Sequence, residues 1–362
     1  MSIRLNDTAT LHPLVLPARA DAAPTETIRA YADVRNRSIR DVTGRTDDAV
    51  SPESLLPLLR SNPEFTRTQW YVTEGDEMVG VATLNIMADS GGTTAITIIS
   101  LLRRAWGRGI GSAVLAHLES TARDAGVSRL LTWVEHPASD AETLPSPTGF
   151  GEIPRDHHAR FLLRHGFSLE QVERVSMLHW SDSVLGRIRD ARTAAERSAD
   201  GYRVVQWRLP TPPEHVAGYA WMKEHMSTDV PDAALGMPAE KWGADRVARH
   251  DDRYARRGIS VLVTAAEHVA SGELCAYNEL AIDADTSVVS HQVDTLVLAS
   301  HRGHRLGMLV KTAGLMTWRT AYPDSPGVIT YNAEENRPML DINEAIGFAP
   351  ISYEGAWKKE LT

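Results

Sequence analysis

The sequence predicts a fold of mixed helices and strands (α/β, in the wide sense that includes α+β) in two tandem copies. Two glycine turns, at residues 106–111 and 302–307, each lie between an apolar, β-branched segment and a helical pattern. A short helix in each half also ends on Gly-Phe, at Gly166 and at Gly347. An ordered pattern of elements that occurs twice indicates an internal duplication.

The chain length agrees with two repeats. A sequence of 362 residues is long enough for about two domains, each with a core of its own. We place the N-terminal domain at residues 1–182 and the C-terminal domain at residues 201–362. Residues 183–200 carry apolar side chains at helical spacing, which predicts a linking helix between the two domains.

Turn and cap residues bound the elements of the N-terminal half. Ser51 and Pro52 begin a helix, and Gly75 marks the turn of a strand pair. Gly126 is a C-cap, and residues 137–154, rich in Pro, Ser, Thr and Gly, are interpreted as a long loop. The predicted strands cover residues 14–17, 68–73, 78–87, 95–102, 129–135 and 172–180, and an early helix covers residues 26–41.

The C-terminal half repeats this order. Two early helices precede a strand pair, which is followed by the strand that enters the second glycine turn. A helix, a strand and a short helix then complete the repeat. The predicted helices cover residues 215–226 and 242–257, and the predicted strands cover residues 202–209, 259–266, 271–282, 288–298 and 327–331.

Composition restricts the class of protein. The formal charge is -9, and no apolar run approaches the roughly 20 residues of a membrane span. We therefore expect no nucleic-acid partner, no membrane partner and a cytoplasmic location. The single cysteine, Cys275, argues against an intramolecular disulfide and a cysteine-ligated zinc site, so no metal is expected.

Each glycine turn is a candidate anion site. A turn that begins a helix leaves several backbone N–H groups without partners at the positive end of the helix dipole. Glycine also allows a pyrophosphate to approach the backbone closely. Glycine serves ordinary strand-to-helix turns as well. The short helix that ends on Gly-Phe in both halves is therefore needed as a second indication.

The two turns together resemble the cofactor loop of the GNAT superfamily of acyl-CoA-dependent N-acetyltransferases, in a tandem arrangement like that of mycothiol synthase. That loop reads Gln/Arg-x-x-Gly-x-Gly/Ala. The second turn matches at Arg302 and Gly307 but has Arg305 in the place of the inner glycine. The first turn matches at two glycines but has Trp106 in the Gln/Arg place.

The resemblance implies a mixed, mostly antiparallel sheet in each half, splayed beside its glycine turn and flanked by helices. It also implies acetyl-CoA as cofactor, bound by the turns and by backbone groups of the preceding strands. The cofactor-binding residues that it implies are Leu101, Leu102, Arg103, Gly107, Arg108, Gly109, Gly111 and Ser112 in one half, and Val297, Leu298, Arg302, Gly303, His304, Arg305 and Gly307 in the other.

The candidate catalytic residues lie in the C-terminal half. Members of the superfamily often use a carboxylate on the strand before the turn as general base, which implies Asp294, with Glu279 on the neighbouring strand as a second candidate. Asn336 holds a familiar position eleven residues before Gly347, where it would bind cofactor amide or water. The adjacent His157 and His158 of the other half are interpreted as solvated loop residues.

The usual thiolate-protonating tyrosine is absent from both halves, where Leu162 and Asn343 hold its places. Two functions therefore remain open. The first is direct acetyl transfer from acetyl-CoA to a primary amine of a small molecule, as a monomer or a homodimer. The second is a non-catalytic acyl-CoA-binding or interaction protein with degenerate domains.

Overall fold

The computed structural model describes residues 2–19, 22–137, 139–140 and 142–361. Among these residues, no helix is both long and apolar enough to cross a membrane. The helices are α1 (Glu26–Thr43), α2 (Pro52–Leu59), α3 (Ile110–Asp124), α4 (His157–Arg164), α5 (Asp182–Glu196), α6 (Pro213–Asp229), α7 (Ala244–Arg256), α8 (Leu306–Ala321) and α9 (Arg337–Ile346).

The strands form one mixed sheet that runs through both halves. Its order is β1-β2-β3-β4-β5-β6-β15-β9-β14-β13-β12-β11-β10. A separate hairpin is formed by β7 (Thr143–Pro145) and β8 (Glu152–Pro154) inside the region predicted as a long loop. The sheet strands are β1 (Ile3–Arg4), β2 (Ala9–Pro13), β3 (Phe65–Glu74), β4 (Glu77–Met87), β5 (Thr94–Leu101), β6 (Arg129–His136), β9 (Ser168–His179), β10 (Tyr202–Arg208), β11 (Ser260–His268), β12 (Glu273–Ile282), β13 (Ser290–Val297), β14 (Gly327–Ala333) and β15 (Ala349–Glu360).

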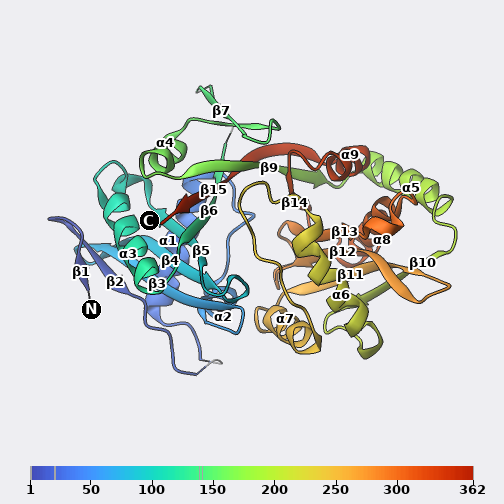
Figure 1. Cartoon of the computed structure of the whole chain (residues 1–362), viewed down its shortest axis with the longest axis horizontal. Coiled ribbons are helices and arrows are strands. Elements are labelled where there is room, and N and C mark those ends of the chain that lie inside the picture. Colours follow the sequence, from blue (N-terminus) through green and yellow to red (C-terminus); the bar gives the residue numbers. More distant parts are fainter. Residues whose placement is uncertain (1, 20–21, 138, 141, 362) are drawn as a thin grey trace.

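The two halves exchange their last strands. Strand β9 of the N-terminal half pairs with β14 of the C-terminal half, and β15 pairs with β6 of the N-terminal half. The two exchanged strands also pair with each other along most of their length. Figure 1 shows β9 (green) and β15 (red) running between the two halves. The duplicated fold is confirmed, but its two sheets are joined into one.

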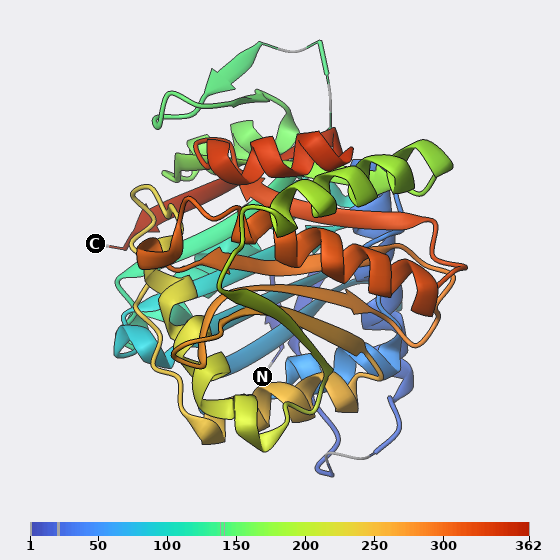
Figure 2. The same ribbon diagram turned by 90° about the vertical axis from the view of Figure 1, so that its right-hand side faces the viewer.

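Helices cover both faces of the sheet. In the C-terminal half, α6 and α7 pack on one face through Tyr219 and Val247 against Val263 and Tyr277. On the other face, α8 packs against the alternate residues of the same strands, because successive side chains of a strand point to opposite faces. Figure 2 looks onto this half and shows α5, α8 and α9 side by side.

The sheet splays beside each glycine turn. Parallel pairing of β5 with β6 stops at Ile96, and that of β13 with β14 stops at His291. Beyond these points each pair of strands diverges, which confirms the predicted splay. Strand β13 also bulges, because two of its residues, Val293 and Asp294, lie opposite the single residue Glu279 of β12.

One predicted strand was misplaced. Residues 14–17 were expected to form the first strand, but the strand is β2 and ends at Pro13. The Leu14 N–H still bonds to Gln69, after which Pro17 has no N–H to continue the ladder. The expected linking helix is α5, whereas the domain boundaries at residues 182 and 201 stay a prediction because the last strands are exchanged.

Candidate functional site

The second glycine turn forms the N-terminal end of α8. Its backbone passes through the left-handed region at Gly303, with φ of 92°, and again at Arg305, with φ of 55°. Gly109 of the first turn has φ of 78° in the place of Arg305. An arginine can adopt this conformation at some cost in strain, so the missing inner glycine leaves the turn intact.

Both turns leave backbone donors unpaired. The first N–H groups of α3 and α8 have no acceptor inside the helix, and no side chain caps either end. Neither first turn carries an acidic residue. The donors and the helix dipole therefore fit an anion such as the pyrophosphate of CoA.

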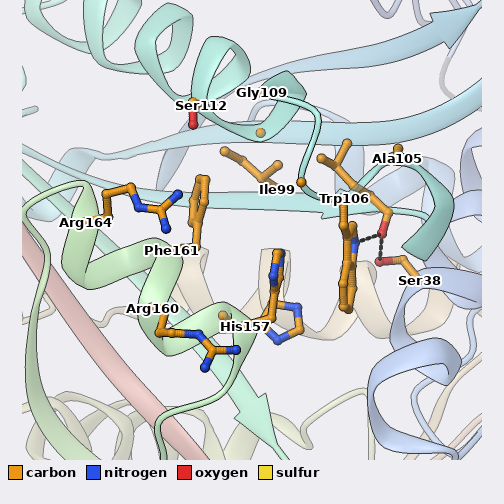
Figure 3. Close-up of a pocket in the computed structure, with 14 residues that line it drawn as sticks. Ser38, Ile99, Ala105, Trp106, Gly109, Ser112, His157, Arg160, Phe161 and Arg164 are labelled. Carbon is orange, nitrogen blue, oxygen red and sulfur yellow. Dashed lines mark hydrogen bonds between the residues drawn. The ribbon is translucent and has the colours of Figure 1, made fainter.

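The Gln/Arg position of each turn is tied back to the preceding strand in the same way. Arg302 Nε donates to the Val297 carbonyl at 3.4 Å, and Trp106 Nε1 donates to the Leu101 carbonyl at 2.8 Å. The Leu101 carbonyl also accepts from Ser38, as Figure 3 shows. Trp106, which departs from the family pattern in sequence, thus makes the same contact as Arg302.

A cavity of about 440 Å³ lies against the second turn. It brings Asn336 together with the turn, and the Asn336 side chain makes no hydrogen bond to another described residue. Of the residues predicted to bind cofactor here, Val297, Arg302, Gly303, Arg305 and Gly307 line this cavity. We call it the donor cavity.

A second cavity of about 410 Å³ lies beneath the segment between α6 and α7, and we call it the acceptor cavity. It shares Val230 and Pro231 with the donor cavity. A smaller space of about 180 Å³ lies between the two and is lined by Asn336 from one side and Glu173 from the other. Apolar side chains line part of the acceptor cavity, together with the cations Lys223 and Arg253 and with carboxylates and aromatic rings, which are Asp294, Asp232, Glu173, Glu240, Trp133, Trp242 and Tyr254.

Asp294 and Glu279 meet at one lysine. The ammonium of Lys223, on α6, lies 2.5 Å from Asp294 Oδ2 and 3.3 Å from Glu279 Oε1. Tyr277 donates to Asp294 at 3.2 Å, and Tyr219 donates to Glu279 at 2.5 Å. We call these five side chains the lysine cluster.

The environment of the lysine cluster changes its ionisation. Burial alone would raise the pKa of Asp294, but the Lys223 ammonium and the Tyr277 hydroxyl hold that pKa below its usual value. Burial alone would lower the pKa of Lys223, but its two carboxylate neighbours raise it above the usual value. Asp294 is thus ionised at neutral pH and already paired with a cation, which weakens it as a base.

The two predicted carboxylates differ in access. Asp294 lines the acceptor cavity, and 22% of its side chain is exposed. The side chain of Glu279 is 0% exposed and belongs to none of the cavities described here. Only Asp294 of this pair can therefore touch an acceptor without rearrangement of the fold.

Glu173, on the exchanged strand β9, is a carboxylate that sequence reasoning missed. It lines both the acceptor cavity and the smaller space beside Asn336, and accepts from Trp133 Nε1 at 3.0 Å. Burial raises the pKa of Glu173, and the nearby Glu335 raises it further, against the opposing effect of Trp133. A carboxylate with a raised pKa is better suited to accept a proton than an ion-paired one.

The first turn borders a cavity of about 220 Å³ whose lining residues differ from those of the donor cavity (Figure 3). The His157 imidazole stacks on Trp106 with ring centroids 4.5 Å apart and an interplanar angle of 4°. Burial and His158 lower the pKa of His157, which favours the neutral ring. Arg160 and Arg164 of α4 line the same cavity and supply its positive charge, and His157, which is exposed as expected, forms part of its wall.

The predicted cofactor residues of the first turn divide into two groups. Leu101, Gly107, Gly109, Gly111 and Ser112 line the cavity. The others have different surroundings. Leu102 is buried in the core, Arg103 donates to the Asp41 carbonyl, and Arg108 pairs with Glu74.

In the second half, Leu298 is likewise a core residue, and exposed His304 lies beside Tyr202. The side chains of these five residues do not reach the cavities, so a contact with cofactor stays a prediction. No local signal in the sequence identified Lys223, Glu173, Arg160 or Arg164, because distant segments bring them to the cavities.

Comparison with known proteins agrees with this geometry. A profile of the acetyltransferase (GNAT) family matches residues 36–144, and no curated protein matches the chain. A tandem GNAT protein from the clavulanic acid biosynthesis pathway is similar, with 23% identity, a TM-score of 0.73 and coverage of 98% of this chain and 99% of that one.

Two further structures share the fold. A GCN5-related N-acetyltransferase from Sphaerobacter thermophilus is 14% identical, with a TM-score of 0.61 and coverage of 99% and 97%. A Pyrococcus horikoshii structure described as an acetyltransferase is 12% identical, with a TM-score of 0.54 and coverage of 98% and 90%. Residues 36–144 therefore match the acetyltransferase (GNAT) family in sequence, and the whole chain shares the fold of a tandem GNAT protein.

Proposed function

We propose that the protein transfers an acetyl group from acetyl-CoA to a primary amine of a small molecule, and that its C-terminal half does so. The observation that carries this proposal is the adjacency of the donor and acceptor cavities beside one splayed strand. The unpaired N–H groups of α8 face the first cavity, and Asp294 and Glu173 line the second.

The donor cavity fits the cofactor by its own groups. The N–H groups around Gly303 and Gly307, with Arg302 and Arg305, would hold the pyrophosphate. The unbonded Asn336 amide would bind an amide of the pantetheine arm or a water. Bound acetyl-CoA supplies an activated thioester, and the chain supplies position and proton transfer.

The acceptor cavity fits a cationic amine. Four carboxylates, of Asp294, Asp232, Glu173 and Glu240, line it against two cations, Lys223 and Arg253, and the aromatic rings beside them can contact a cation or an apolar carbon skeleton. The ammonium group must lose a proton before its nitrogen attacks the thioester carbonyl. Asp294 was the base predicted from sequence. Glu173 is a second candidate for the general base, because its pKa is raised whereas that of Asp294 is lowered.

A non-catalytic acyl-CoA-binding role is the second candidate. Both tyrosine positions hold other residues, and the Asn343 side chain bonds to buried Lys311 at 2.5 Å instead of facing the donor cavity. This arrangement leaves the thiolate without a protein acid at that place. A thiol leaves as a thiolate near neutral pH more easily than most leaving groups, so such an acid is not essential.

Thiol release from acetyl-CoA, measured with a panel of primary amines, separates the two candidates. Amine-dependent release that falls in Arg302→Ala supports catalysis at the second turn. Binding of acetyl-CoA without release for any amine of the panel supports the non-catalytic role.

A further inference from the structure

A second group of chemically reactive side chains lies behind the second glycine turn, away from both cavities. Glu273 and Cys275 come from the start of β12, and His301 ends the 3₁₀ helix that precedes Arg302. A Glu273 carboxylate oxygen, the Cys275 sulfur and a His301 ring nitrogen all lie within 4.8 Å of one another. His301 Nε2 is 3.6 Å from a Glu273 carboxylate oxygen.

A β-bulge places the cysteine in this group. Ala266 of β11 pairs with Ala276, but the next residue, Glu267, pairs with Leu274, so Cys275 is the extra residue of β12. Bulges redirect a side chain out of the regular alternation of a strand. The Cys275 sulfur is buried, whereas Glu273 is exposed and gives a path from solvent.

Neighbouring groups hold two of the three side chains in place. Tyr202 hydrogen-bonds His301 Nδ1 at 2.8 Å, which leaves Nε2 toward Glu273 and Cys275. Metal-binding histidines generally have such a partner on the other ring nitrogen. The Cys275 thiol donates to the Glu273 carbonyl at 3.3 Å, which holds the sulfur beside Glu273, and metal binding would replace this contact by a bond to the ion.

We propose that Glu273, Cys275 and His301 bind one divalent transition-metal ion of the zinc type. Thiolate, imidazole and carboxylate are the ligands that zinc takes in proteins, at about 2.0–2.3 Å. Three protein ligands leave a fourth position for water. Binding releases the thiol proton to solvent, and the carboxylate and imidazole bind without a change of covalent bonds.

No metal was expected from the sequence, because the chain has one cysteine. One cysteine excludes zinc sites with several cysteine ligands, but not a site whose other ligands come from distant segments. His301 follows Cys275 by 26 residues in the sequence, and only the fold brings the two side chains together. An ion here would fix the segment immediately before Arg302, at the entry to the donor cavity.

Cobalt(II), which substitutes for zinc and absorbs light, gives the sharpest test. The full chain is freed of metal with a chelator and titrated with Co²⁺. We expect one equivalent to bind with a thiolate-to-cobalt charge-transfer band in the near ultraviolet, and Zn²⁺ to remove that band. Because Cys275 is the single cysteine of the sequence, the band reports on this residue alone.

Variants then locate the other ligands. Cys275→Ser should abolish the band, and His301→Ala and Glu273→Gln should each weaken Co²⁺ binding. Tyr202→Phe should weaken it by about 10–100-fold, the usual effect of removing a partner of a ligand. His268→Ala is the matched control, since its ring lies 5.8 Å from that of His301 but outside the three-residue group, and it should leave affinity unchanged.

Each variant is checked for folding without metal by circular dichroism. Wild-type protein without a thiolate band would overturn the proposal. Loss of the band in His268→Ala, with retention in His301→Ala, would overturn the ligand assignment. If His301→Ala does not fold, the exposed Glu273→Gln decides, because unchanged Co²⁺ affinity in that variant contradicts the proposed set.

Discussion

Replacing Asp294 by asparagine tests the catalytic role that we propose for this residue. In the lysine cluster, two carboxylates face the single ammonium of Lys223. Asp294→Asn leaves one carboxylate, that of Glu279, against that ammonium. No buried charge loses its only partner, so the loss of stability should be that of one charged hydrogen bond, about 1–3 kcal/mol.

The effect on turnover should be much larger. If Asp294 receives or positions the proton of the acceptor amine, Asp294→Asn should lower kcat by roughly 10²–10⁴-fold. That loss corresponds to about 3–5 kcal/mol of activation free energy. The affinity for acetyl-CoA should change little, because the donor cavity is built from other residues.

Glu279→Gln is the matched control. It removes the same charge from the same lysine, but Glu279 reaches none of the cavities described above. We expect a comparable loss of stability and a loss of kcat below about tenfold, or 1.4 kcal/mol. The assay is amine-dependent thiol release with an authentic acceptor, beside denaturant unfolding of each variant. Wild-type turnover in folded Asp294→Asn, or equal losses of turnover in both variants, would refute the assignment.

Three further predictions concern other parts of the molecule. Lys223→Met leaves buried Glu279 and half-buried Asp294 without a cation, so it should destabilise the fold by about 3–5 kcal/mol in denaturant unfolding. The loss should be smaller at low pH, where these carboxylates are protonated. Because the pKa of Glu173 is raised in the fold, the folded state binds more protons there than the unfolded state, and stability falls as pH rises above the usual glutamate value of about 4.3. Glu173→Gln removes this pH dependence, so the free energy of unfolding at pH 8, relative to that at pH 5, should be higher in the variant than in the wild type. Chemical denaturation at both pH values measures this, and the same difference between the two pH values in both proteins would contradict it. Gly109→Val, at φ of 78°, should remove one CoA equivalent per chain in titration calorimetry, whereas unchanged stoichiometry and affinity would show that the first turn does not bind CoA.

Local chemistry made the fold predictable. The glycine turns, the caps at Ser51 and Gly126 and the alternating strands are signals carried by neighbouring residues, and they identified most elements and the duplication. Two positions that depart from the family motif in sequence fit it in structure. Arg305 adopts the left-handed backbone of a glycine, and Trp106 makes the contact of an arginine.

The strand exchange was beyond local signals. No signal in the local sequence of β9 distinguishes completion of its own half from completion of the other half. Only the global packing decides between them, and that choice brings Glu173 to the acceptor cavity. Lys223 was missed for a related reason, since its two carboxylate partners come from strands more than 50 residues away in sequence.

The assignment of catalysis to the C-terminal half is tested most directly by comparing Gly107→Val with Gly303→Val. The two glycines hold the same place in their turns, both have positive φ, and in each case open space surrounds an added Cβ, so the cost in strain is matched. Amine-dependent thiol release from acetyl-CoA is measured for both variants and the wild type. We predict that Gly303→Val loses turnover while Gly107→Val retains it. Retained turnover in Gly303→Val together with lost turnover in Gly107→Val would place the chemistry in the N-terminal half.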